Sequence, residues 1–247
     1  MNETTYIIGN WKMHGDAAIA SELAAASAAT ATDENVQVVL CPPACWLRDV
    51  QQALNGSAVA LGGQDCHYEE AGAHTGDVSA NMLKALGCGY VLVGHSERRQ
   101  NHHESDSLVR SKAEAALKAG LTPVICVGET LQEKESKQTS IVLDKQLHKS
   151  VPEGRVQDVI IAYEPVWAIG SGKTPTTEEI GQVHAHIKAY FAADKSGDKQ
   201  PTVVYGGSVK SANAVEILAQ NEVDGVLVGG ASLKADDFET IIKAGTN

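Results

Sequence analysis

The sequence has little positive charge. Lys and Arg total 20 residues against 31 Asp and Glu, which gives a net charge of -11 at pH 7. Binding to a nucleic-acid backbone needs basic residues that neutralise phosphates, so this charge balance argues against a nucleic-acid partner. Any anionic ligand must therefore be held by local geometry rather than by a broad basic face.

The sequence also lacks the features of an exported or membrane protein. The first residues, MNETTYIIGN, contain no basic region followed by a long apolar run. No apolar stretch reaches the roughly 18 residues that a membrane span needs. We therefore expect a protein of the cytoplasm with no membrane partner.

Cysteine is sparse and its spacing is not that of a metal site. Five cysteines are present, an odd number, and without an export signal a disulfide framework is not expected. Cys41 and Cys45, in CPPAC, lack a second pair at the spacing of a zinc ribbon. The sequence also contains no dinucleotide-binding fingerprint, so we predict neither a metal nor a cofactor.

Short apolar runs rich in Val and Ile recur eight times, at residues 6–9, 36–40, 59–62, 90–94, 123–128, 159–163, 202–206 and 225–229. Several are apolar throughout, which is typical of parallel strands covered on both faces. Segments with helical spacing follow them, such as Val109, Ala113 and Ala116 before the terminating Gly120. Thr176 with Glu179 matches a capping box, and Ser211 is expected to N-cap a helix over 212–220.

Eight βα units in 247 residues favour an α/β fold of one domain, residues 1–247, in which eight parallel strands close into a (β/α)8 barrel surrounded by helices. An open doubly wound sheet is the alternative. In such a barrel the chemistry takes place at the carboxyl ends of the strands. The residues just after each run are therefore the candidates for a functional site.

Three ionisable side chains follow these strands. Glu164 ends the sixth run among apolar neighbours, where loss of water is expected to raise the pKa of its carboxyl group toward that of a general base. His95 precedes SERR, an expected helix start, whose dipole favours a neutral imidazole that still donates a hydrogen bond. Lys12 lies two residues past Asn10, and Glu97 is expected to pair with it. The alternatives are that Glu164 forms a structural ion pair and that His95 is an ordinary histidine with hydrogen-bonding neighbours and no role in catalysis.

Two glycine pairs follow the seventh and eighth runs, in YGGS (205–208) and VGG (228–230). In barrels of this kind these two loops commonly bind a phosphate through backbone amides. The nearby GSGKT (170–174) is not a complete P-loop, because Trp167 stands where the first glycine is required. Instead, the segment is predicted to be a lid, comprising Pro165, Val166, Trp167, Ala168, Ile169, Gly170, Ser171, Gly172, Lys173, Thr174 and Pro175.

A base, a neutral donor, a cation and a phosphate-binding loop suit proton abstraction next to a carbonyl. Glu164 would remove the carbon-bound proton while His95 and Lys12 stabilise the oxygen that becomes negative, each donor being worth roughly 3 to 4 kcal/mol of barrier. A lid over such a site excludes water and retains the enediolate intermediate until it is reprotonated.

The chain resembles the triosephosphate isomerase family over most of its length, in GNWKM (9–13), GAHTGD (72–77), VGHSERR (93–99), GLTPVICVGE (120–129), AYEPVWAIGSGKTP (162–175), YGGSV (205–209) and GVLVGGASLK (225–234). The resemblance implies the TIM-barrel fold and the interconversion of two phosphorylated trioses in glycolysis and gluconeogenesis. It implies Glu164 as the base, His95 as the electrophile, Lys12 as the substrate-binding cation and Asn10 as its hydrogen-bonding partner, with Ser96 and Glu97 in support.

The same resemblance implies phosphate contacts from Gly170, Ser208, Gly229 and Gly230. It also implies a homodimer, in which the loop over 72–77 enters the neighbouring subunit and Thr75 approaches that subunit's active site. His74 stands where an aromatic residue is usual in the family. Asp77 replaces a more common Glu, which shortens the reach to Arg98 of the partner.

Two other functions compete with an isomerase. GSGKT suggests a nucleotide-binding protein, which tight magnesium-dependent ATP binding would reveal. The glycine loops alone are consistent with a phosphosugar-binding barrel without turnover, which a coupled activity assay distinguishes from an enzyme.

Overall fold

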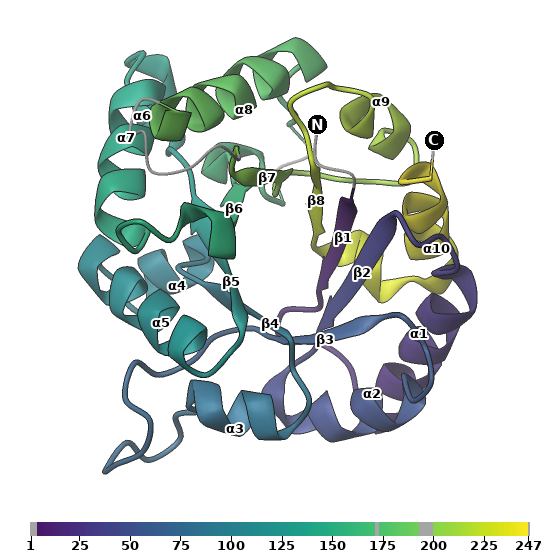
Figure 1. Ribbon diagram of the computed structural model, residues 1–247. Coiled ribbons are helices and arrows are strands. Elements are labelled where there is room, and N and C mark those ends of the chain that lie inside the picture. Colours follow the sequence, from purple (N-terminus) through teal and green to yellow (C-terminus); the bar gives the residue numbers. More distant parts are fainter. Residues whose placement is uncertain (1–3, 171–172, 193–199, 247) are drawn as a thin grey trace.

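The computed structural model describes residues 4–170, 173–192 and 200–246, and within these ranges eight parallel strands close into a barrel (Figure 1). They are β1 (Thr5–Asn10), β2 (Val36–Cys41), β3 (Ala60–Gly63), β4 (Tyr90–Val93), β5 (Thr122–Val127), β6 (Ile160–Tyr163), β7 (Thr202–Tyr205) and β8 (Gly225–Val228). Strand β1 pairs with both β2 and β8, which closes the ring. The predicted (β/α)8 barrel is thus confirmed, with each strand within one residue of its expected bounds.

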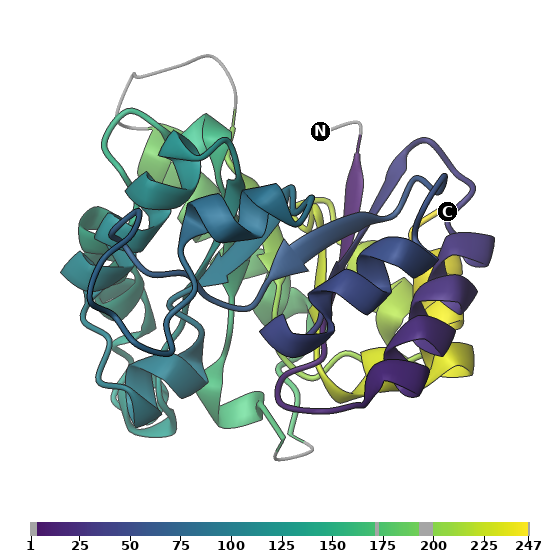
Figure 2. The ribbon, with the colours of Figure 1, turned by 90° about the horizontal axis from the view of Figure 1, so that it is seen from below.

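Helices surround the strands on the outside (Figures 1 and 2). The α-helices are α1 (Ala17–Thr30), α2 (Leu47–Ala53), α3 (Ala80–Ala85), α4 (Ser96–Asn101), α5 (Asp106–Lys118), α6 (Leu131–Glu135), α7 (Thr139–Ser150), α8 (Thr177–Ala192), α9 (Ala214–Leu218) and α10 (Ala235–Ala244). Short 3₁₀ turns are η1 (Ala44–Trp46), η2 (Val156–Asp158), η3 (Val166–Ala168) and η4 (Gly230–Leu233). Among the helices of these described ranges, none is long and apolar enough to cross a membrane.

The apolar residues divide into an inner and an outer core. Successive side chains of a strand point to opposite faces, so alternate residues fill the barrel or pack against the helices. Ile8 belongs to the inner cluster and Ile7 to the outer one. In β6, Ile160 and Ala162 belong to the inner cluster. The same alternation directs the next residue in that series, Glu164, toward the inside of the barrel at its carboxyl end.

The helix ends follow most of the local signals in the sequence. The N–H of Glu179 donates to Thr176 Oγ1 at 3.1 Å and the N–H of Thr176 to Glu179 Oε2 at 2.8 Å, so the capping box is confirmed. Gly120 follows α5 with a φ of 76°, a conformation that glycine adopts without strain.

The prediction for Ser211 was wrong. Helix α9 begins only at Ala214, and its first turn has no side-chain cap. The hydroxyl of Ser211 instead donates to Asp237 Oδ1 at 2.8 Å, which ties the loop after β7 to α10. Sequence pattern alone did not reveal this tertiary partner.

His184 of α8 is fully buried beside β6. Its Nδ1 lies 3.3 Å from the carbonyl oxygen of Glu222, and its ring meets Tyr163 edge-on at 6.0 Å between centroids. Burial lowers the pKa of His184 from 6.5 to about 3. The native state therefore keeps the imidazole neutral over a pH range in which the unfolded chain protonates it.

We expect His184 to make the protein less stable in mild acid. Below pH 6.5 His184 becomes protonated in the unfolded state but stays neutral in the native state. The free energy of unfolding should therefore fall by about 2 kcal/mol between pH 6.5 and 4.5 because of this residue alone. Urea unfolding of wild type and His184→Gln across this range measures the difference. His148→Gln, at an exposed position of α7, is the control, and equal slopes for all three proteins would contradict the assignment.

Candidate active site

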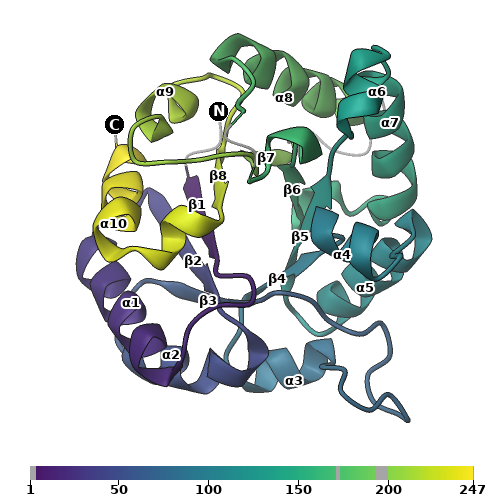
Figure 3. The same cartoon turned by 180° about the vertical axis from the view of Figure 1, so that it is seen from behind.

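A pocket of about 650 Å³ lies at the carboxyl ends of the strands, the end of the barrel seen in Figure 3. The pocket brings together residues from both ends of the chain. Those that the sequence analysis selected are Asn10, Lys12, His95, Glu97, Glu164, Ile169, Gly170, Gly206, Gly207, Ser208, Gly229 and Gly230. A volume of this size suits a small ligand with room for water.

Glu164 directly follows β6 and is only 2% exposed. Its Oε2 accepts a hydrogen bond from the N–H of Ser96 at 2.9 Å, and its Oε1 lies 3.0 Å from Nε2 of His95. Burial raises the pKa of Glu164, as expected, but His95, the N–H of Ser96 and Lys12 together outweigh it and leave the pKa lowered. The sequence predicted only the effect of burial, because the donors come from other strands.

His95 forms the N-cap of α4 and is almost completely buried. Its Nδ1 accepts a hydrogen bond from the N–H of Glu97 at 3.2 Å, which a neutral ring with its proton on Nε2 can do. The remaining N–H then points toward Glu164. Burial lowers the pKa of His95, but the Glu164 carboxylate outweighs it, so the pKa is raised, contrary to the expectation from the helix start alone. The charge on this ring therefore depends on where the Glu164 carboxylate lies.

Lys12 adopts a φ of 52°, a region that few residues other than glycine enter. Its N–H donates to Asn10 Oδ1 at 2.9 Å, and its carbonyl accepts from Gln64 Nε2 at 2.7 Å. These two amide side chains hold the unusual backbone conformation. Lys12 Nζ forms the expected ion pair with Glu97, which leaves the ammonium group at the pocket beside Glu164.

Glycines shape the side of the pocket formed by the loops after β7 and β8. A Cβ built at Gly206 would lie 2.9 Å from Glu164 Cγ, and one at Gly229 would lie 3.4 Å from Lys12 Cε. Ser208, held by its carbonyl against Asn213 Nδ2 at 3.1 Å, completes this side. Small residues thus let backbone amides approach a ligand next to the ionisable groups.

The predicted lid begins immediately after Glu164, and its residues 166–168 form η3. Trp167 Nε1 donates to Glu129 Oε1 at 2.9 Å, and Lys134 Nζ lies 3.9 Å from the centroid of the Trp167 ring. Ile169 and Gly170 line the pocket, whereas Ser171 and Gly172 lie outside the described residues. A bulky apolar side chain is unusual in a surface loop, but Trp167 packs here against the loop after β5 and against α6.

The residues expected at a subunit interface do not line this pocket. His74, Thr75 and Asp77 belong to the loop over residues 64–79, which extends away from the barrel between β3 and α3 (lower left in Figure 1). Within the chain, Arg98 pairs with Asp65 at 2.9 Å and with Glu104 at 2.6 Å.

Sequence reasoning missed several contributors to the site, among them Leu227 and Gly128. Leu227 adds an inward-facing apolar wall to the pocket. Gly128 lies against the backbone of Glu164, where an added Cβ would be 1.7 Å from the carbonyl oxygen. The alternation of Val124 and Cys126 already placed Gly128 on the inner face, which is the signal that was available.

Known proteins resemble the chain along its whole length. A model of the triosephosphate isomerase family matches residues 5–245. Proteins named triosephosphate isomerase from Afipia carboxidovorans and Paracidovorax citrulli are each 50% identical to it, over 96% of both chains for the first and 99% for the second. The crystal structure of triosephosphate isomerase from Bartonella henselae superposes with a TM-score of 0.90 at 43% identity, covering 98% of this chain and 99% of that one.

Proposed function

The chain belongs to the triosephosphate isomerase family, and from this premise we propose that Glu164, His95 and Lys12 perform its reaction. The enzyme is an aldose–ketose isomerase that interconverts dihydroxyacetone phosphate and D-glyceraldehyde 3-phosphate. The observation that supports these roles is that the three side chains meet in one pocket. The buried carboxylate of Glu164 lies 3.0 Å from Nε2 of His95, and Lys12 lines the same pocket.

In the proposed reaction, Glu164 takes a proton from the carbon next to the substrate carbonyl. The Nε2–H of His95 and the ammonium group of Lys12 stabilise the enediolate oxygen, and proton return to the neighbouring carbon gives the isomer. A glutamate base acting with a neutral histidine is the established description of this family's chemistry. Asn10 and Gln64 act by holding the backbone of Lys12.

Glu164 must change partners to act as the base. In this structure its oxygens are used by His95 and by the N–H of Ser96. A substrate carbonyl that takes over the Nε2–H of His95 removes one donor, and the turn of the carboxylate toward carbon removes the other. Both losses raise the pKa of Glu164, so its basicity increases when the substrate is in place.

The glycine-rich side of the pocket is proposed to bind the substrate phosphate, with contacts from Gly170, Ser208, Gly229 and Gly230. Residues 165–175 are proposed to close over it, excluding water from the enediolate. Trp167 and its partners Glu129 and Lys134 would hold the beginning of this lid before it closes.

Replacement of Lys12 tests the charge-stabilising role. Lys12→Met keeps the length of the side chain but removes the cation, so kcat/KM should fall by about 100- to 1,000-fold, the usual cost of losing one donor to a developing oxyanion. A coupled assay in both directions measures this. Lys145→Met, at an exposed position of α7, should leave activity unchanged, and an undiminished Lys12→Met enzyme would exclude the proposed role.

We further propose that residues 1–247 form one catalytic domain and that the active form is a homodimer in the cytoplasm, where glycolysis consumes and supplies its substrates. The loop over residues 64–79, which contains Thr75 and projects from the barrel (Figure 1), supports an exchange of loops between subunits. Analytical ultracentrifugation at the enzyme concentration of the activity assay measures the oligomeric state. A monomer with full activity would contradict the proposed dimer.

A further inference from the structure

Arg99 of α4 is not among the residues that line the catalytic pocket, and its side chain is only 16% exposed. All three nitrogens of its guanidinium group are used. Nε donates to the carbonyl of Gly94 at 2.8 Å, Nη1 to Asp106 Oδ1 at 2.7 Å, and Nη2 to the carbonyl of Cys126 at 3.1 Å. Nη2 also donates to Ser150 Oγ at 3.2 Å. One cation thus joins the ends of β4 and β5 to α5 and α7.

The two carbonyls bound by Arg99 occupy equivalent positions on neighbouring strands. The pairing of β4 with β5 runs as far as Val93 opposite Ile125, so Gly94 and Cys126 are the next residues in the same register. The guanidinium group bonds to both of them and continues the connection between the strands for one more residue. A planar group with several fixed donors suits this arrangement, whereas a lysine has a single nitrogen to serve every acceptor.

The two strand ends that Arg99 connects lead to the proposed electrophile and the proposed base. Gly94 immediately precedes His95, and the N–H of Arg99 donates to the carbonyl of His95 at 3.0 Å. Cys126 belongs to the inner cluster of the barrel, where burial and the nearby Glu164 carboxylate raise the pKa of its thiol. The residues held by Arg99 are therefore neighbours of His95 in the chain and of Glu164 in space.

Gly94 lets Arg99 and α5 approach the chain closely. Its φ of 68° lies in the left-handed region that favours glycine. An added Cβ would lie 2.7 Å from Val109 Cγ2 and 3.1 Å from Arg99 Nη2. The path of the chain into His95 is therefore fixed by packing as well as by hydrogen bonds.

We propose that Arg99 is a positioning residue for the isomerase reaction, which holds His95 and Glu164 at their working separation by tying β4 to β5. This inference rests on the proposed roles of those two residues. His95 Nε2 lies 3.0 Å from Glu164 Oε1. Loss of the tie lets the strand ends shift, and a displacement of about 1 Å in a catalytic group typically lowers the rate about 100-fold.

The competing explanation is that Arg99 and Asp106 form a buried ion pair that only stabilises the fold. Removal of one partner then lowers stability but leaves full kcat in the folded protein. Under the proposal, kcat falls while affinity for phosphate is kept. The glycine-rich loops proposed to bind phosphate follow β7 and β8, in a different part of the ring from β4 and β5 (Figure 3).

The variants Arg99→Lys and Arg99→Met of the full chain test the proposal in the coupled assay, under conditions where circular dichroism shows each to be folded. Arg99→Lys keeps the charge and should lower kcat by about tenfold or more, and Arg99→Met should lower it by about 100-fold. The inhibition constant for inorganic phosphate should change by less than about twofold in both, because its proposed binding loops stay in place.

Lys188 of α8 offers a matched control. Its side chain is 7% exposed and pairs at 3.2 Å with the buried Asp224, which directly precedes β8 at the amino end of the barrel. Lys188→Met therefore breaks a comparable buried pair far from the proposed reacting groups. It should lower the unfolding temperature while leaving kcat and phosphate inhibition unchanged.

The nuclear magnetic resonance signal of the His95 Nε2–H gives a readout that does not depend on turnover, because this proton faces Glu164 in the free enzyme. The signal should shift in Arg99→Met and stay in place in Lys188→Met. If Arg99→Met does not fold, Arg99→Lys decides the question with the same measurements.

A loss of kcat smaller than about tenfold in the folded Arg99 variants would overturn the proposal. An equal loss of phosphate affinity, or an equal loss of kcat in Lys188→Met, would also overturn it. When kcat is unchanged, the His95 signal separates two failures. A shifted signal means that the proposed roles of His95 and Glu164 are wrong, whereas an unshifted signal means that Arg99 does not position them.

Discussion

Replacement of Glu164 by Gln should lower kcat/KM for triosephosphate isomerisation by about 1,000- to 10,000-fold, the upper range for loss of a general base. An amide cannot accept the carbon-bound proton, although it keeps the size of the side chain. The variant should also fail to introduce deuterium into dihydroxyacetone phosphate in heavy water, because the exchange passes through the same proton abstraction.

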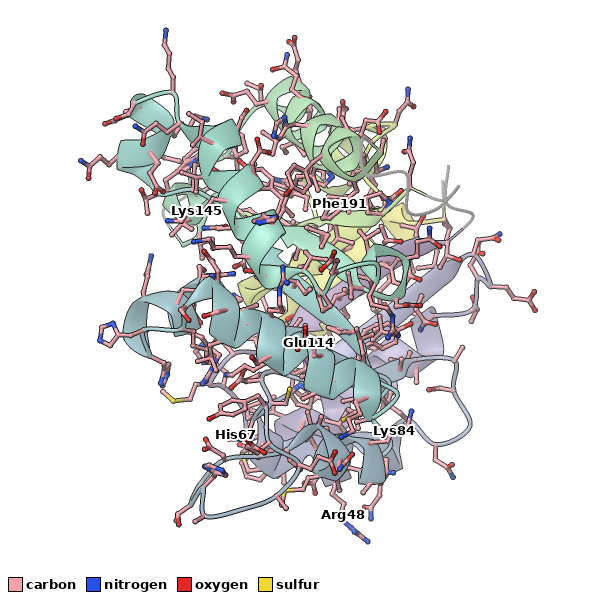
Figure 4. The ribbon with its side chains drawn as sticks, turned by 60° about the vertical axis from the view of Figure 1, so that its left-hand side comes forward. Arg48, His67, Lys84, Glu114, Lys145 and Phe191 are labelled. Atoms are coloured by element: carbon pink, nitrogen blue, oxygen red, sulfur yellow. The ribbon has the colours of Figure 1, made fainter. Side chains whose placement is uncertain are left out.

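Stability must be measured beside activity for this variant. The Gln amide can keep one of the two hydrogen bonds to His95 and Ser96 but not both with ideal geometry, so a loss of about 1 to 3 kcal/mol in unfolding free energy is expected. Glu114→Gln, at an exposed position of α5 labelled in Figure 4, is the control for both measurements. Full deuterium exchange in the Glu164→Gln enzyme would remove Glu164 from the role of base.

Replacement of Gly128 by Ala should lower kcat/KM by about 100-fold, although Gly128 does not line the pocket. The new Cβ would lie 1.7 Å from the carbonyl oxygen and 2.6 Å from the carbonyl carbon of Glu164, so the backbone must move. A displacement of about 1 Å in a catalytic group typically costs this much. Gly128 is also fixed on its other side, since Gln146 bonds to both its N–H and its carbonyl at 2.8 and 3.1 Å.

Overpacking at Gly128 should also destabilise the fold by about 1 to 3 kcal/mol, which urea unfolding measures. Gly89→Ala is a suitable control, because a Cβ at that position meets no atom within 4 Å and its backbone is not in the left-handed region. A Gly128→Ala enzyme with wild-type turnover would show that the base tolerates a shift of its backbone, contrary to this account.

The sequence was sufficient for the architecture because the fold depends on regular local patterns. Continuous apolar runs placed the eight strands within one residue, and local capping signals at Thr176 and Gly120 placed helix ends. The order of βα units then favoured a closed barrel. Since this fold collects the carboxyl ends of all strands at one rim, the pattern also predicted that Asn10, His95 and Glu164 would share one site.

Contacts between distant segments were beyond the sequence pattern. Ser211 has the chemistry of an N-cap, but Asp237 in α10 takes its hydroxyl instead. Similarly, the contact between the rings of His67 and His74, 4.0 Å apart between centroids, depends on how the loop over 64–79 folds, which has no periodic signal.

The sequence by itself therefore determined the barrel and its rim, and it indicated the residues proposed to carry the reaction. Only the tertiary structure decided the electrostatic state of Glu164 and His95. Burial alone would raise the pKa of the carboxyl group, but donors from two other parts of the barrel reach it and lower that pKa instead. The physical reason is that burial follows from a residue's own neighbours in the chain, whereas electrostatic interactions depend on distances that folding alone sets.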